Sequence, residues 1–166
     1  MKDFGNHGFR IANSTTEIKL AYTGFLLFAF LGYLTFGLIS LLRVGPGYQD
    51  IVTHYLGSNL EETGVFPRAF GQMLEEAHFH AFIEGLILLV LAHLFVATKV
   101  RRRLKMWVVL LAYVATLSDL ASPWLIRYVA PWFAWMQMTS WIVMFTSALI
   151  LIGVPLYEMW LSRKAR

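Results

Sequence analysis

Four long apolar stretches occupy most of this 166-residue chain, and they restrict its fold more than any other feature. Their approximate bounds are 20–42, 80–98, 106–126 and 135–160. Each comes near or exceeds the roughly 20 residues that an α-helix needs to cross a bilayer. Backbone groups in lipid must pair within their own segment, so these stretches are expected to be helices. The chain is therefore predicted to be an all-α integral membrane four-helix bundle, with residues 1–166 forming a single transmembrane domain.

The composition agrees with a chain whose solvent is lipid. Hydrophobic residues make up 58% of the chain and charged residues only 14%, whereas soluble domains carry about 25% charged residues. The chain has no cysteine, which excludes disulfides, thiolate metal sites and covalently attached c-type haem. Any metal or cofactor would have to be held by His, Met or carboxylate side chains.

The basic residues predict how the bundle is oriented. Of the 14 Lys and Arg residues, only Arg43, Arg68 and Arg127 fall on the side of the loop 44–74. The others include Lys2, Arg163, Lys164 and Arg166 near the two ends. The positive-inside rule then places both termini in the cytoplasm of a multi-pass protein, here expected in a bacterial inner membrane. The basic run at 99–105 serves topology and anionic lipid, so no nucleic-acid partner is expected.

The outer loop and the start of the second apolar stretch contain the groups suited to metal binding. Glu76, His80 and Glu84 are spaced i, i+4 and i+8, which places them on one helix face as a candidate metal-ligand set. His78 points to a different face. An alternative outer metal site would use His54, His78, His80, Glu75 and Glu76. Within the loop, QDIVTHYLGSN is expected to form a short interfacial helix.

Two carboxylates, Glu84 and Asp119, are expected at similar depth in the membrane. They would repel each other unless one is protonated or both are bridged. If the second and third stretches pack together, His80, Glu84, Asp119 and Arg127 form one buried polar cluster. The simpler alternative is an ion pair between Asp119 and Arg127, with His78 and His80 among lipid head groups.

The string HFH at 78–80 resembles the haem-ligating helix of the haem–copper oxidase superfamily, over about fifteen residues. In that superfamily one histidine of such a pair is an axial ligand of low-spin haem, so the resemblance implies haem b bound by His78 or His80. His80 and His93 are thirteen residues apart, a spacing similar to that between ligands of two stacked haems in membrane cytochromes b. The three candidate cofactor ligands are therefore His78, His80 and His93.

A haem in this chain would need a second axial ligand from elsewhere, because the first, third and fourth stretches contain no histidine. The candidates are His54, Met136, Met138 or a residue of another subunit. For His93 the alternative is a purely structural hydrogen bond to a neighbouring helix, for instance to Glu158 or Tyr22.

The wider pattern of strings TGF, HYLGS, EAHFHAF, SPWLIRYVAP and PLYEMW resembles small uncharacterised four-helix proteins of bacterial inner membranes. Such proteins accompany respiratory or cytochrome-containing assemblies. The first hypothesis is therefore a membrane subunit of a respiratory or electron-transfer complex, which binds haem b or contacts quinol near the outer face. Its partners would be other membrane or periplasmic subunits, or further copies of itself.

Two other functions remain open at this point. One is a proton- or cation-translocating or metal-binding module that uses Glu84 and Asp119. The other is a purely structural subunit that docks a larger partner. An enzyme acting alone is the least expected reading, since a single polar cluster and a single sizeable loop are available to build a site. No catalytic residue is assigned.

Overall fold

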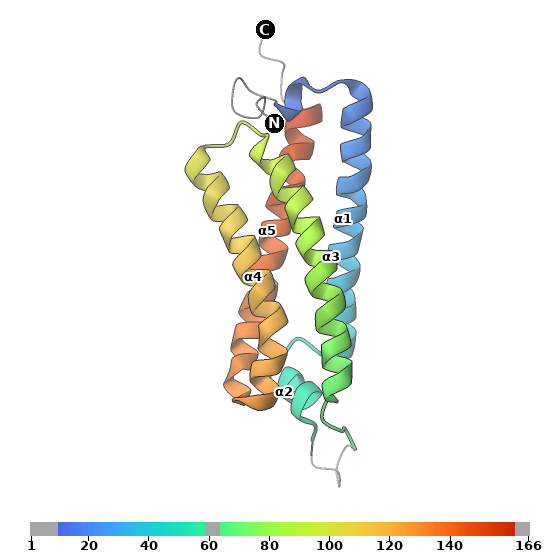
Figure 1. Cartoon of the computed structure of the whole chain (residues 1–166), viewed down its shortest axis with the longest axis vertical. Helices are drawn as coiled ribbons and strands as arrows, with labels where there is room; N and C mark the ends of the chain where they lie inside the picture. Colours follow the sequence, from blue (N-terminus) through green and yellow to red (C-terminus); the bar gives the residue numbers. More distant parts are fainter. Residues whose placement is uncertain (1–9, 59–63, 162–166) are drawn as a thin grey trace.

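The computed structural model describes residues 10–58 and 64–161, and all the regular structure in these ranges is helical. The four long helices are α1 (Thr16–Arg43), α3 (Phe70–Val96), α4 (Arg102–Tyr128) and α5 (Ala134–Trp160). The short elements are η1 (Ile11–Asn13), α2 (Tyr48–Leu56) and η2 (Pro131–Phe133). The long helices stand side by side (Figure 1), and each is long and apolar enough to cross a membrane. The predicted all-α four-helix membrane bundle is confirmed.

The two ends of the bundle differ in how the chain closes them. We call the end with η1, the α3–α4 link and Trp160 the basic end, and the end with α2 the loop end (Figure 1). At the basic end the Ile11 N–H donates to the Ala97 carbonyl over 3.2 Å. Both described chain ends thus lie together, as the predicted orientation requires. The cytoplasmic placement itself stays a prediction, and Lys2, Arg163, Lys164 and Arg166 lie outside the described residues.

The predicted spans match α1, α4 and α5, but the second span begins earlier than expected. Helix α3 starts at Phe70, ten residues before His80. The prediction followed apolar side chains, whereas a helix requires only its own backbone hydrogen bonds and so continues through polar residues. The outer loop is correspondingly shorter. The short helix expected within it is confirmed as α2, and its place at the membrane interface stays a prediction.

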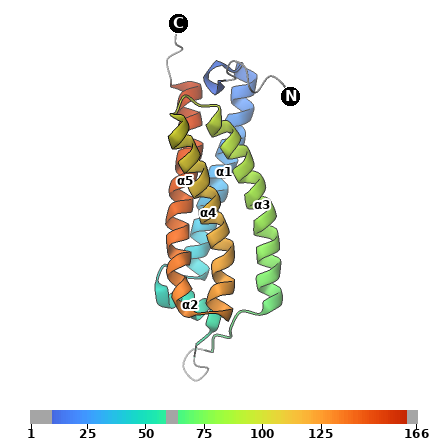
Figure 2. The same ribbon diagram turned by 60° about the vertical axis from the view of Figure 1, so that its left-hand side comes forward.

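The hydrophobic core is concentrated in the basic-end half of the bundle. Helix α5 contacts the other three long helices, and its contact with α4 is the most extensive. The buried residues of α3 are Leu88, Leu91, Ala92, Leu94 and Phe95, with only Met73 in its loop-end half. Helix α3 is therefore packed mainly through its basic-end half. Its other half diverges from α4 (Figure 2) and meets it again at the end, where the ring of Phe70 contacts that of Trp124 edge to face with centroids 5.4 Å apart.

Two glycines of α1 play different parts in helix packing. At Gly37 an added Cβ would lie 2.6 Å from the ring of Phe145, so the glycine lets α1 and α5 approach closely. At Gly32 an added Cβ would meet nothing within 4 Å. Gly37 thus supports close helix contact, whereas Gly32 faces open space.

Candidate functional site

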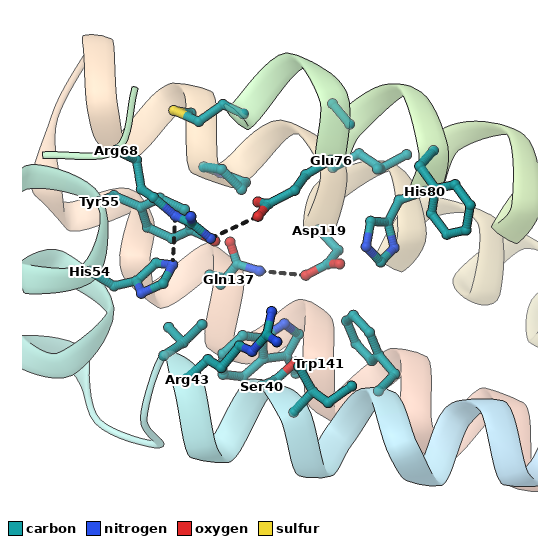
Figure 3. Close-up of a pocket in the computed structure, with 18 of the residues that line it drawn as sticks. Ser40, Arg43, His54, Tyr55, Arg68, Glu76, His80, Asp119, Gln137 and Trp141 are labelled. Atoms are coloured by element: carbon teal, nitrogen blue, oxygen red, sulfur yellow. Dashed lines mark hydrogen bonds and ion pairs between the residues drawn. The ribbon is translucent and has the colours of Figure 1, made fainter. Parts of the chain in front are cut away.

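A cavity of about 460 Å³ lies in the loop-end half of the bundle, where all five α-helices contribute to its wall (Figure 3). Much of the wall is apolar and aromatic. Its charged and polar side chains include Thr35, Ser40, Arg43, His54, Tyr55, Arg68, Glu76, His80, Asp119 and Gln137. We call this space the loop-end cavity. It brings ionisable groups from segments far apart in the sequence to one place.

Asp119 of α4 is held at the wall of this cavity by Gln137 of α5. The Gln137 Nε2 donates to Asp119 Oδ1 over 2.5 Å, and the two residues are only 3% and 7% exposed (Figure 3). The Ser122 hydroxyl donates to Gln137 Oε1 and also lies 3.1 Å from the Asp119 carbonyl. Because Pro123 has no N–H, that carbonyl lacks its usual helical partner. Pro123 thus leaves the Asp119 carbonyl without a helical donor at the place where Asp119 and Ser122 of α4 form hydrogen bonds with Gln137 of α5.

The ring of His80 is oriented by Glu84, four residues further along α3. His80 Nδ1 and Glu84 Oε1 are 2.9 Å apart. With Glu84 ionised, the Nδ1–H donates this bond and leaves Nε2 as the atom that can accept a proton or a hydrogen bond. The rings of Phe36 and Phe79 meet the imidazole edge to face, with centroids 5.8 and 5.9 Å away. The arrangement fixes one basic nitrogen in a largely aromatic setting.

Arg68 connects α2 to α3 at the outer rim of the cavity. Its backbone N–H donates to the Tyr55 carbonyl over 3.2 Å, which positions the side chain. The Nε then donates to His54 Nε2 over 3.1 Å, and Nη2 donates to Glu76 Oε1 over 2.7 Å. A histidine nitrogen that accepts a hydrogen bond carries no proton, so His54 is neutral here. Burial lowers the pKa of His54, and the charge of Arg68 lowers it further.

A second, apolar space of about 290 Å³ lies between α1 and α3, and we call it the α1–α3 groove. It shares Gly32, Phe36, Phe79 and His80 with the loop-end cavity. Its other lining residues are Phe25, Phe28, Ala29, Tyr33, Ile83, Glu84 and Ile87. His80 therefore stands where a mixed polar cavity meets an apolar groove.

The structure brings together three of the four members of the predicted polar cluster. His80 and Glu84 are hydrogen-bonded, and both lie near enough to Asp119 for their charges to interact with it. Arg127 stays apart: its guanidinium lies 5.7 Å from the Tyr128 ring centroid. Within residues 10–58 and 64–161 it forms no ion pair with Asp119. The expected Asp119–Arg127 pair is therefore wrong, because Gln137 occupies the carboxylate.

The predicted metal-ligand set is not assembled. In the described parts of the chain, no group of three or more His, Asp or Glu residues is arranged to hold a metal ion. Glu76 is engaged by Arg68, whereas His80 and Glu84 bond to each other. Of the alternative outer set, Glu75 and His78 are exposed on the surface of α3. Equal spacing on one helix face placed the side chains in a row but did not make them converge.

The histidines proposed as haem ligands occupy separate surroundings. His78 and His93 are exposed, and His80 is half-buried. His93 Nδ1 lies 2.7 Å from the Leu89 carbonyl of its own helix. Its expected structural bond to Glu158 or Tyr22 is thus wrong: Glu158 is buried and accepts hydrogen bonds from the Lys99 backbone N–H at 2.6 and 2.9 Å. Haem binding by these histidines stays a prediction.

Some residues of the cavity received no role in the sequence analysis. Gln137 lines the cavity, and Ser122 is hydrogen-bonded to it; both are uncharged polar residues inside apolar stretches. Polar residues in a membrane span need a hydrogen-bond partner, so their positions in the sequence could have indicated a polar contact between helices. Arg68 was used only to assign orientation. Phe36 and Gly32 gave no signal, since their importance depends on how α1 lies against α3.

The family comparison agrees with this membrane architecture. Residues 45–166 match the model of Aq_1264_TM, described as a transmembrane helical domain. The chain belongs to this family. The matched region includes α2, α3, α4 and α5, and hence most of the wall of the loop-end cavity. Among curated proteins and among solved structures, none matches the chain. The chain is thus a small multi-pass membrane protein in contact with the lipid bilayer.

Proposed function

We propose that the chain is a membrane subunit of an electron-transfer complex and that its loop-end cavity binds the head group of a quinol-class molecule. The cavity volume of about 460 Å³ falls within the roughly 300–1,000 Å³ typical of small-molecule sites. Such sites are mostly apolar with a few placed polar groups. The loop-end cavity has this character, and it lies within a membrane bundle where a lipophilic ligand would be dissolved.

The observation that carries the proposal is the position of His80. Its ring is oriented by Glu84 and lines both the polar cavity and the apolar groove. A quinol hydroxyl donates a hydrogen bond, and Nε2 of His80 is an acceptor of the right kind. An imidazole backed by a carboxylate also suits proton acceptance near neutral pH.

Binding to His80 would couple proton and electron release in a simple way. When a quinol is oxidised to a quinone, its hydroxyl protons must leave with its electrons. The protons would pass to His80 and from there toward Glu84. The electrons would pass to a redox centre of a partner subunit, for which haem b is the expected class.

The proposal is tested by ligand binding to the purified full chain in lipid nanodiscs. The probe is a ubiquinone analogue with two isoprene units, reduced to the quinol, and the readout is quenching of tryptophan fluorescence. Trp124 and Trp141 line the cavity. Saturable quenching is expected, and His80→Ala should weaken binding roughly tenfold through the lost hydrogen-bond acceptor.

His93→Ala is the matched control, since it removes an exposed histidine of the same helix at the basic end. It should bind like the unmodified chain. Quenching that never saturates, or equal binding by His80→Ala and the unmodified chain, would refute a quinol site at His80.

A second candidate function is proton conduction through Glu84 and Asp119. The observation in its favour is that Glu84 Oε2 and Thr116 Oγ1 are buried and have no hydrogen-bond partner among the described residues. In proteoliposomes containing a pH-sensitive dye, Glu84→Gln and Asp119→Asn should each abolish proton flux driven by an imposed potential. Flux that persists in both variants would eliminate this candidate.

A further inference from the structure

The α1–α3 groove adjoins the loop-end cavity, with which it shares four lining residues, but differs from it chemically. Apart from Tyr33, His80 and Glu84, its lining is aliphatic, aromatic or glycine. Two of its lining residues are among the more exposed apolar side chains, Phe28 at 78% and Phe79 at 61%. In a membrane these side chains face lipid. The groove therefore leads from the lipid phase to the half-buried ring of His80.

The groove is open because α1 and α3 do not pack closely. Helix α1 makes its main contact with α5, and α3 makes its main contacts with α4 and α5. Gly32 of α1 lies in the wall of the groove, and a Cβ at this position would meet open space. A Cβ at Gly32 would therefore displace no protein atom, and a longer side chain there would occupy space where the groove meets the loop-end cavity.

We propose that the α1–α3 groove binds the isoprenoid tail of the quinol-class ligand, and that Gly32 determines whether a tailed ligand fits. This inference rests on the proposed binding of the head group beside His80. A molecule with its head at His80 can extend into the groove, because His80, Phe36 and Phe79 line both spaces. The tail would lie against Phe28, Ile83 and Ile87, and the head would stay in the polar cavity.

The lining favours an isoprenoid tail over a phospholipid. A phospholipid head carries a phosphate, which proteins bind through Arg, Lys or backbone N–H groups. None of the described residues that line the groove is Lys or Arg. The polar groups near its end are instead an imidazole, which suits a neutral hydroxyl donor, and a carboxylate, which repels a phosphate when ionised. The two arginines, Arg43 and Arg68, lie in the wall of the loop-end cavity and not in the groove, and Arg68 is already paired with Glu76.

The test compares two ligands and two variants of the full chain in nanodiscs. One ligand is the quinol head group without a tail, and the other carries two isoprene units. Gly32→Leu places an aliphatic side chain in the groove. Gly153→Leu is the matched control, because Gly153 is an exposed glycine of α5 that also has nothing within 4 Å of an added Cβ. Leu is a better helix former than Gly, so both variants should fold.

Gly32→Leu is expected to weaken binding of the tailed quinol by at least about tenfold, the scale of steric discrimination in an apolar pocket. Binding of the tail-less head group should be weakened by a clearly smaller factor, because Gly32 lines the groove and also the edge of the loop-end cavity. Gly153→Leu should match the unmodified chain with both ligands. Because partitioning into lipid is the same for all variants, it does not affect this comparison.

Two results would overturn the tail site and leave the head-group site standing: Gly32→Leu binds both ligands normally, or it weakens both equally. If the unmodified chain bound neither ligand, the tail site and the proposed function would both be wrong. The His80→Ala variant tests the head-group site separately from the tail site, since it should weaken binding of the tail-less and the tailed ligand to the same degree.

Discussion

The amide of Gln137 donates to the buried carboxylate of Asp119 over 2.5 Å and so joins α5 to α4 in the loop-end half of the bundle. Both residues are almost fully buried. A buried carboxylate that loses its donor retains the full penalty of desolvation. The stability of this half of the bundle therefore depends on a neutral amide that provides a hydrogen bond to a buried carboxyl group.

Gln137→Ala is expected to destabilise the protein by about 1–3 kcal/mol, because it leaves the Asp119 carboxylate without this donor. Thermal unfolding in detergent, followed by circular dichroism, measures the loss. Asp119→Asn is the comparison, since it removes the charge and keeps a hydrogen-bonding side chain, so its effect should be smaller. Equal unfolding temperatures for Gln137→Ala and the unmodified chain would contradict this account.

Glu158 should be the most sensitive carboxylate at the basic end. It is 7% exposed, and both of its oxygens accept from the Lys99 N–H in the α3–α4 link. Glu158→Ala should lower stability by about 1–3 kcal/mol, since it removes the charged acceptor of the part-buried bond from the Lys99 N–H. Glu158→Gln keeps one acceptor oxygen and should lose less.

Glu75→Ala is the control for this prediction, because Glu75 is an exposed carboxylate at the other end of the bundle. It should leave thermal unfolding unchanged. If Glu75→Ala and Glu158→Ala had the same effect, the bond to Lys99 would not be the reason for the stability.

The neutral state of His54 predicts a pH dependence of stability. Burial and the charge of Arg68 hold the pKa of His54 below its ordinary value of 6.5, although the Glu76 charge and a hydrogen bond to the Arg43 backbone oppose the shift. Between the folded and the unfolded pKa, the unfolded chain binds more protons. The contribution of His54 to stability is therefore complete above pH 6.5 and is lost as the pH falls through the folded pKa.

His54→Gln should flatten this pH profile, because a glutamine oxygen can accept from Arg68 but does not titrate in this range. The measurement is the unfolding temperature of both proteins from neutral to mildly acidic pH. Parallel profiles for the two proteins would show that protonation of His54 makes no contribution.

The orientation of the bundle is open to direct measurement, because the chain contains no cysteine. A single cysteine at Phe66, which is 73% exposed at the loop end, should react with a membrane-impermeant maleimide added to bacterial cells whose outer membrane has been made permeable. A cysteine at Arg103, at the basic end, should react only after the inner membrane is opened. The reverse pattern would show the opposite orientation.

Hydrophobicity along the sequence was sufficient to predict the four spans. The depth of a residue in a straight helix follows from counting, so the matching positions of Glu84 and Asp119 could be anticipated. The rotation of each helix about its axis could not. Arg127 was placed near Asp119 by depth alone, whereas the packing of α4 on α5 presents Gln137 to the carboxylate.

The contacts that a loop makes were equally inaccessible from the sequence. Arg68 reaches His54 and Glu76 because its backbone is held by the Tyr55 carbonyl, a contact set by the tertiary fold. Likewise, the closeness of Phe36 to His80 depends on the separation between α1 and α3. No periodicity in either stretch encodes that separation.

The packing of α3 mainly through its basic-end half has a mechanical consequence. A helix of 27 residues is about 40 Å long at 1.5 Å per residue. With the packed half as the fixed part, the lever is the loop-end half of about 20 Å, and a tilt of one degree moves its end by about 0.35 Å. The displacement grows toward Phe70, so a tilt of α3 would change the distance between α1 and α3 unevenly along the groove.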